Sequence, residues 1–134
     1  MKVYQTKLEE ADYKAINKWH PSLNGKLEMA YLIYGEAMNL IVGRVEPGTE
    51  FSDDPPHDVE EILFILQGKC VYKDGRVVTG GMATINLAGQ PHGGRFESDD
   101  PNDPNKPCIF VEVAATPKLK EHLKEFKVIA KREE

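Results

Sequence analysis

Between residues 26 and 115 the chain alternates apolar and polar positions in short runs that end at glycine or proline. A period of two is typical of β-strands with one buried face, and glycine and proline are typical of the turns between them. Two of the runs flank Asp74-Gly75, a pair that adopts positive φ readily and therefore predicts a hairpin. The pattern predicts strands at Leu27–Tyr34, Met38–Glu46, Glu61–Gln67, Lys69–Tyr72, Arg76–Val78, Met82–Asn86 and Ile109–Ala115.

Two segments outside this region show helical spacing. Apolar positions recur every three or four residues from Leu8 to Trp19, which predicts a short amphipathic helix. Thr116 and Pro117 supply an N-cap hydroxyl and a first-turn proline, and later apolar residues fall on one face. We therefore expect a C-terminal helix over about 117–127. The segment 97–107, rich in Asp, Asn and Pro, is expected to be an irregular loop, either a lid or a disordered segment.

Short strands at this spacing predict an all-β barrel or sandwich. The 134 residues are expected to form one domain, with a barrel core at about 27–115, an N-terminal arm at 1–26 and the C-terminal helix. Both faces of Glu61–Gln67 are apolar, so one face should lie inside the barrel and the other under a helix or a partner subunit. This strand is one reason to expect a homodimer.

Composition narrows the function classes. The net charge of −5 provides no basic surface for nucleic acid, and the longest apolar runs are too short to cross a bilayer. The N-terminus turns polar at once, so we expect no signal peptide and a cytoplasmic protein. Cys70 and Cys108 are expected to be free, packed thiols in such a compartment.

The candidate chemistry lies with His57, Glu61 and His92. Two imidazoles and a carboxylate are the ligand set of a non-haem metal centre with open coordination positions. A carboxylate on a strand with two apolar faces is costly unless it is paired or bound to a metal, which makes Glu61 the most informative of the three.

The spacing of these residues resembles the two motifs of the cupin superfamily. The segment His57–Gly68 matches the first motif from its second histidine onward, with Gly48 as the opening glycine. The segment Gly81–His92 matches the second motif, with Leu87 in place of its proline. The resemblance spans roughly residues 40–115 and implies a double-stranded β-helix, or jelly-roll barrel, that commonly dimerises.

By this resemblance His57, Glu61 and His92 are metal ligands for a divalent ion (Fe, Zn, Mn or Ni) inside the barrel. Pro55 replaces the first histidine of the motif and offers no donor atom. Three alternatives stay open: a three-ligand site, a fourth ligand from Asp53 or Asp54, or a metal-free pocket that binds a ligand directly.

Other residues bear on the pocket. Metal ligation needs neutral imidazoles held through their other nitrogen, for which Gln90, Asp58 and backbone carbonyls are the nearby acceptors. Arg95, just after a glycine pair, is a candidate for the pocket rim. Three further strand residues could line the barrel: Tyr31, Tyr34 and Asn39. Arg44 is expected to be exposed at a strand end.

Two functions follow from these alternatives. The first is a metal-dependent enzyme acting on a small polar organic substrate, for example an oxygenase, isomerase or lyase. The second is a non-catalytic, metal-free module that binds a sugar or a carboxylate, which the proline at position 55 favours.

Overall fold

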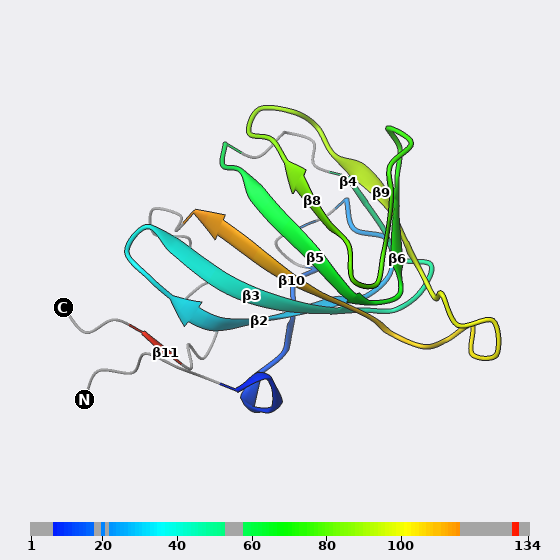
Figure 1. Ribbon diagram of the computed structural model, residues 1–134, viewed down its shortest axis with the longest axis horizontal. Helices are drawn as coiled ribbons and strands as arrows, with labels where there is room; N and C mark the ends of the chain where they lie inside the picture. The colour runs from blue at the N-terminus through cyan, green and yellow to red at the C-terminus, as the bar shows by residue number, and fades with distance from the viewer. Residues whose placement is uncertain (1–6, 18–19, 21, 53–57, 116–129, 132–134) are drawn as a thin grey trace.

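The structure is a computed structural model that describes residues 7–17, 20, 22–52, 58–115 and 130–131. In these residues the regular structure is β-strand apart from 3-10 turns, of which η1 lies at Leu8–Glu10. Two antiparallel sheets face each other across a common core (Figure 1). Nothing in the described part is helical and apolar over the length that would be needed to cross a membrane.

The larger sheet, called sheet A, has seven strands. Its order is β1-β2-β3-β10-β5-β8, and β11 adds to β2 in parallel. Because β3 and β5 both pair with β10, strands far apart in the sequence are joined at the middle of the sheet. The strand bounds are β1 Lys14–Ala15, β2 Leu27–Tyr34, β3 Met38–Val45, β5 Glu61–Gln67, β8 Ala83–Asn86, β10 Cys108–Ala115 and β11 Ala130–Lys131.

The smaller sheet, called sheet B, has the order β4-β9-β6-β7. The Asp74-Gly75 hairpin joins β6 to β7 as predicted: Gly75 has φ of +98°, and Asp74 Oδ1 accepts a hydrogen bond from the backbone N–H of Arg76 at 3.0 Å. The strand bounds are β4 Glu50–Ser52, β6 Lys69–Tyr72, β7 Val77–Thr79 and β9 Gly93–Glu97.

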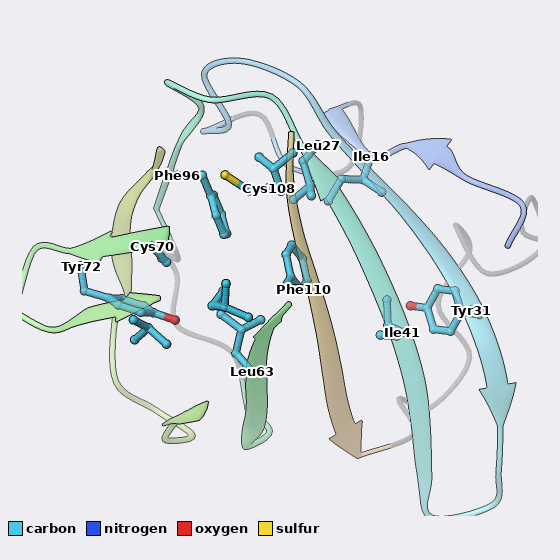
Figure 2. Packing of buried hydrophobic residues seen from close by; sticks show 13 residues of the cluster. Ile16, Leu27, Tyr31, Ile41, Leu63, Cys70, Tyr72, Phe96, Cys108 and Phe110 are labelled. Carbon is cyan, nitrogen blue, oxygen red and sulfur yellow. The ribbon is translucent and has the colours of Figure 1, made fainter. Parts of the chain in front are cut away.

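Alternation decides which side chains enter the core. In β5, Leu63 and Ile65 are buried between the sheets, while Ile62, Phe64 and Leu66 point outward. A row of aromatic rings fills the interior from both sheets: Phe96 of β9 stacks on Phe110 of β10 with ring centroids 5.6 Å apart (Figure 2), and Phe51 contacts Phe96. The remaining core residues are Ile16, Leu27, Tyr31, Ile41, Val45, Cys70, Tyr72, Val78 and Cys108.

Gly43 of β3 is required by this packing. It lies opposite Phe110 in the sheet, and a Cβ atom at position 43 would fall on the Phe110 ring. The glycine therefore lets the ring lie flat over the strand, which a larger residue would prevent.

The outer face of sheet A is divided into two halves. Over β2 and β3, Ala30, Leu32 and Val42 form a second buried cluster, because Ala11 and Tyr13 of the N-terminal arm pack on them. Over β10, β5 and β8 the outward apolar side chains stay partly or largely exposed. One half is thus covered by the chain itself.

The predicted N-terminal helix over 8–19 is wrong. After η1 the chain extends, and β1 pairs with β2 while the Ile16 N–H donates to the carbonyl of Leu27. The edge of β2 offers a row of backbone partners, and Ile16 reaches the core from this extended path, so tertiary contacts override the helical spacing. The predicted C-terminal helix over 117–127 lies outside the described residues.

Four strands were not predicted: β4 and β9 of sheet B, and the two-residue strands β1 and β11 of sheet A. The segment 98–107 is irregular as expected, but it is a succession of tight turns held by its own side chains. Ser98 Oγ donates to the carbonyl of Asp103, and Asp100 and Asp103 accept from backbone N–H groups two residues on. It leads into Cys108, at the opposite end of β10 from Ala114, which pairs with Glu61 (Figure 1). It is therefore not a lid over Glu61.

Candidate functional site

Polar side chains gather at one end of the space between the sheets. The strand register aligns inward-facing residues of five neighbouring strands into rows that cross sheet A. The outermost row is polar except at its centre, and the next row is mixed, whereas the row after it is apolar. The three rows are Tyr34-Asn39-Ala114-Glu61-Asn86, Tyr31-Ile41-Glu112-Leu63-Thr84 and Met29-Gly43-Phe110-Ile65. We call the first two rows, with the sheet B residues that face them, the polar end.

Glu61 opens β5 within this polar end. It pairs with Asn86 of β8 on one side and with Ala114 of β10 on the other, so its side chain shares the inward face with Leu63. The pKa of Tyr31 is raised above its usual value, first by burial and then by the Glu112, Tyr34 and Glu61 side chains. Two carboxylates therefore act on one buried phenol, as expected of a site that concentrates negative charge.

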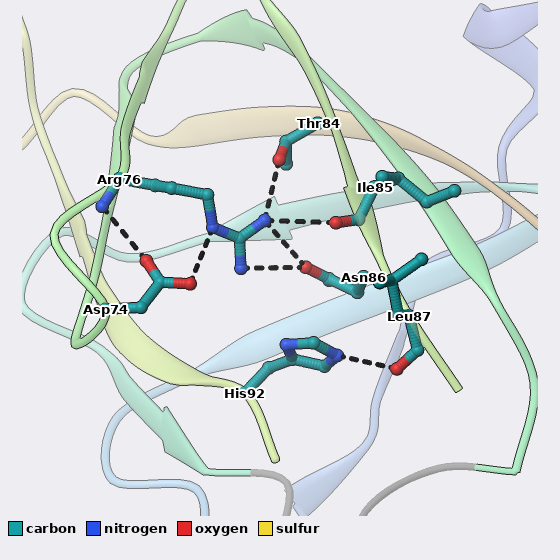
Figure 3. Close-up of polar contacts among 7 residues, drawn as sticks. All are labelled: Asp74, Arg76, Thr84, Ile85, Asn86, Leu87 and His92. Carbon is teal, nitrogen blue, oxygen red and sulfur yellow. Dashed lines mark hydrogen bonds and ion pairs between the residues drawn. The ribbon is translucent and has the colours of Figure 1, made fainter. Parts of the chain in front are cut away.

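His92 is the other predicted ligand that the structure describes. It lies just before β9 and is 8% exposed, and its Nε2 lies 3.1 Å from the backbone carbonyl oxygen of Leu87 (Figure 3). A carbonyl oxygen only accepts, so Nε2 carries the proton in this contact, and in the neutral ring the lone pair is then on Nδ1. Metal-binding histidines need such an acceptor on their other ring nitrogen. Of the acceptors suggested by the sequence, it is a backbone carbonyl, that of Leu87, that contacts His92, rather than Gln90 or Asp58.

Arg76 holds this region together and was not predicted as a site residue. Its guanidinium lies 4.0 Å from the centre of the Tyr72 ring and pairs with Asp74 at 2.8 Å. It also donates to Thr84 Oγ1 at 2.7 Å, to the carbonyl of Ile85 at 3.1 Å and to Asn86 Oδ1 at 3.4 Å (Figure 3). The β6–β7 hairpin is thereby tied to β8, which fixes Asn86 beside Glu61. A charged residue at a hairpin end is ordinarily solvated, so the sequence held no signal for this role.

Two buried polar atoms facing the interior lack a hydrogen-bond partner among the described residues: Asn39 Oδ1 and the Tyr72 hydroxyl. Burial raises the pKa of Tyr72. Asn86 and Cys70 lie close enough to affect this pKa, but neither has the geometry of a hydrogen bond to the hydroxyl. Figure 2 shows that hydroxyl directed from sheet B into the space between the sheets. Unpaired buried polar atoms are uncommon and costly, so they mark positions where a bound molecule or water is expected.

The structure describes two of the three predicted ligands, and each is connected to the end of β8. Glu61 pairs with Asn86, and His92 is bonded to Leu87, the next residue along the chain. His57 lies outside the described residues, as do Pro55, Asp53 and Asp54. Among the residues that are described, no group of three or more His, Cys, Asp or Glu side chains is placed to hold a metal, so a site would need a donor from beyond them.

The other expectations have mixed outcomes. Tyr31, Tyr34 and Asn39 line the interior, and Arg44 is exposed, as predicted. Arg95 does not border the polar end: it is exposed on β9, pairs with Glu97 at 2.5 Å, and lines a separate pocket of about 320 Å³ with Glu50, Ser52 and Lys73.

Both cysteines are free and buried, as expected. Burial raises the pKa of the Cys70 thiol to about 12, so it is not a nucleophile at neutral pH.

The comparisons with known proteins agree with this architecture. No family model matches the sequence, and no curated protein is significantly similar to it. Among solved structures, a predicted oxalate decarboxylase of Thermotoga maritima superposes with a TM-score of 0.66 at 20% identity, over 85% of this chain and 100% of that one.

An RmlC-like cupin of Shewanella frigidimarina has a TM-score of 0.66 at 15% identity, covering 91% and 96% of the two chains. KdgF of a Halomonas species has a TM-score of 0.63 at 12% identity, covering 84% and 92%. Likeness at these identities defines the fold. The chain therefore has the cupin fold, as its sequence motifs predicted, with two antiparallel sheets around a core.

Proposed function

We propose that this chain binds a divalent metal through His57, Glu61 and His92 at the polar end and acts there on a small polar organic molecule. The observation that carries the proposal is the contact from His92 Nε2 to the Leu87 carbonyl, because it leaves Nδ1 as the donor atom at the end of the barrel where Glu61 lies. The donor chemistry of two imidazoles and one carboxylate fits Fe, Zn, Mn or Ni.

A bound metal would supply Lewis-acid or oxygen-activating chemistry, with Glu61 as a ligand rather than a general base. The protein's own groups would fix the geometry: Arg76 holds Asn86 beside Glu61, and the Tyr31 phenol lies near both Glu61 and Glu112. An oxygenase, isomerase or lyase activity would suit such a site. The fold neighbours named as a predicted oxalate decarboxylase and as the polyketide cyclase RemF of Streptomyces resistomycificus support a catalytic role.

A second candidate function is a metal-free module that binds a small polar ligand. The unpaired Asn39 Oδ1 and Tyr72 hydroxyl favour it, because together they would accept and donate hydrogen bonds to a hydroxylated or carboxylated molecule. Asp53 or Asp54 as a fourth metal ligand is the remaining alternative within the first function.

Metal analysis of protein purified without added metal tests the proposal. We expect about one bound ion per chain in the wild type, by elemental analysis, and its loss in His92→Ala and in His57→Ala. His20→Ala is the matched control, since this histidine is outside the proposed ligand set, and it should keep the metal. A wild type that takes up no Fe, Zn, Mn or Ni under any loading condition would contradict the proposed metal site and favour the metal-free binding module. Asp53→Asn and Asp54→Asn should leave the metal content unchanged if three ligands suffice.

We propose further that the protein acts in the cytoplasm as a homodimer. The support is the apolar outer face of β5, for which the sequence left a helix or a partner subunit as the cover.

A further inference from the structure

One continuous surface of the described molecule is apolar and uncovered. Five of its nine exposed large apolar side chains lie together on the outer face of β5 and β8 and just beyond β8, and each is about two-fifths to one-half exposed. The register places Ile62 beside Ile85 on one side and beside Val113 of β10 on the other. We call this surface the apolar face; its exposed members are Ile62, Phe64, Leu66, Ile85 and Leu87.

The apolar face has no charge within it. Every outward residue of β5, β8 and β10 is Ala, Val, Ile, Leu or Phe, and all of these positions are described. Its five exposed side chains offer on the order of 450 Å² of surface, which is as large as the biggest apolar patch that a typical monomer exposes. Such a patch on a protein of net charge −5 does not suit an anionic membrane, which attracts basic surfaces.

From this we infer that the apolar face is the surface on which a second copy of this chain docks, face to face about a two-fold axis. This specifies the homodimer proposed above and is independent of the metal. A two-fold interface uses the same patch on both copies, which a flat row of uncharged side chains satisfies without charge complementarity. Two copies would bury about 1,000 Å² from these side chains and their neighbours in β10, which is at the lower limit of about 1,000 Å² for a biological interface.

The rest of sheet A offers less. The other half of its outer face is already covered by Ala11 and Tyr13 of the arm. At the edge strand β8, the Ile85 carbonyl accepts a hydrogen bond from Arg76, so this edge is partly closed to a further strand. A face-to-face contact over β5 and β8 therefore suits the molecule better than an extension of the sheet.

Light scattering after size exclusion, over a series of protein concentrations, tests the inference. We expect the wild type to be dimeric and Ile62→Lys and Ile85→Lys to weaken dimerisation by about 100-fold or more, since each places two lysines in an apolar interface. Met38→Lys and Val77→Lys are the matched controls, because these residues are at least as exposed, at 60% and 49%, but lie off the apolar face.

The variants should fold, because they alter exposed side chains, and circular dichroism verifies this. The double variant Ile62→Thr with Ile85→Thr keeps strand propensity and should also be monomeric. A wild type that is monomeric at every concentration would overturn both the dimer and its surface. A dimer that survives all the face variants would overturn the surface alone, and the metal content, measured in parallel, reports separately on the metal site.

Discussion

The two ends of the barrel use the same strands for opposite purposes. At the apolar end, rings and aliphatic side chains fill the interior, and the Phe110 ring occupies the space that a side chain at Gly43 would need. At the polar end, the same β3, β10 and β5 carry Asn39, Glu112 and Glu61 inward. Unpaired buried polar groups reduce stability, and apolar burial raises it. The comparison teaches that apolar packing at one end stabilises the fold, which offsets the cost of burying polar groups at the other.

The largest test of this division is Phe110→Ala at the apolar end. It removes a ring that stacks on Phe96, and we expect the free energy of unfolding to fall by about 3–5 kcal/mol. Urea unfolding followed by circular dichroism measures it. Phe110→Leu, which keeps most of the volume, should cost less than about 2 kcal/mol, and equal losses in the two variants would contradict the packing argument.

At the polar end the corresponding change should have the opposite sign. Asn39→Leu replaces a 2% exposed amide whose Oδ1 is unpaired, so we expect the free energy of unfolding to rise by about 1 kcal/mol while binding of a small ligand is lost. Asn86→Leu is the matched control: its Oδ1 accepts from Arg76, and its loss should destabilise by about 1–3 kcal/mol. Destabilisation by Asn39→Leu would show that the Asn39 amide contributes to the stability of the fold.

The smallest effect concerns the Asp74–Arg76 contact that borders the polar end. The backbone N–H of Arg76, together with its guanidinium, holds the pKa of Asp74 below its usual value. A lowered pKa in the folded state stabilises the fold above the unfolded pKa of about 3.9, and this stabilisation is lost as the pH falls through the folded value. Because Asp74 is largely exposed, we expect Asp74→Asn to cost only a few tenths of a kcal/mol at pH 7. Unfolding curves at pH 7 and pH 3 should show that difference shrink in acid; a cost as large at pH 3 as at pH 7 would point to another origin.

Sequence reasoning predicted the sheet-forming segments well wherever alternation was strong. The bounds of β2, β5 and β6 match their predictions, and the cupin fold followed from two spaced motifs. It missed β9 because Gly93-Gly94 is typical of a turn, whereas here Gly94 is buried opposite Tyr72 and a side chain would strike the neighbouring backbone. The prediction of an N-terminal helix was wrong because the segment pairs as a strand with the edge of β2.

Ligand chemistry and motif spacing pointed to Glu61 and His92 as candidate ligands. The register places Glu61 at the polar end, and the His92 ring contacts the carbonyl of Leu87, just beyond β8. The roles of Arg76, Asn86 and the Leu87 carbonyl depend on which segments meet across the two sheets, which is a long-range property that local pattern does not contain.

The contact between Gly43 and Phe110 also limits how this protein can evolve. A side chain at position 43 would occupy the space of the ring, so Gly43 is not free to change unless residue 110 becomes smaller. We expect lineages descended from this chain to keep the pair, or to replace it by a larger residue at 43 together with a smaller one at 110. The residue that position 43 can hold thus depends on the residue at position 110, which lies 67 residues away in the sequence.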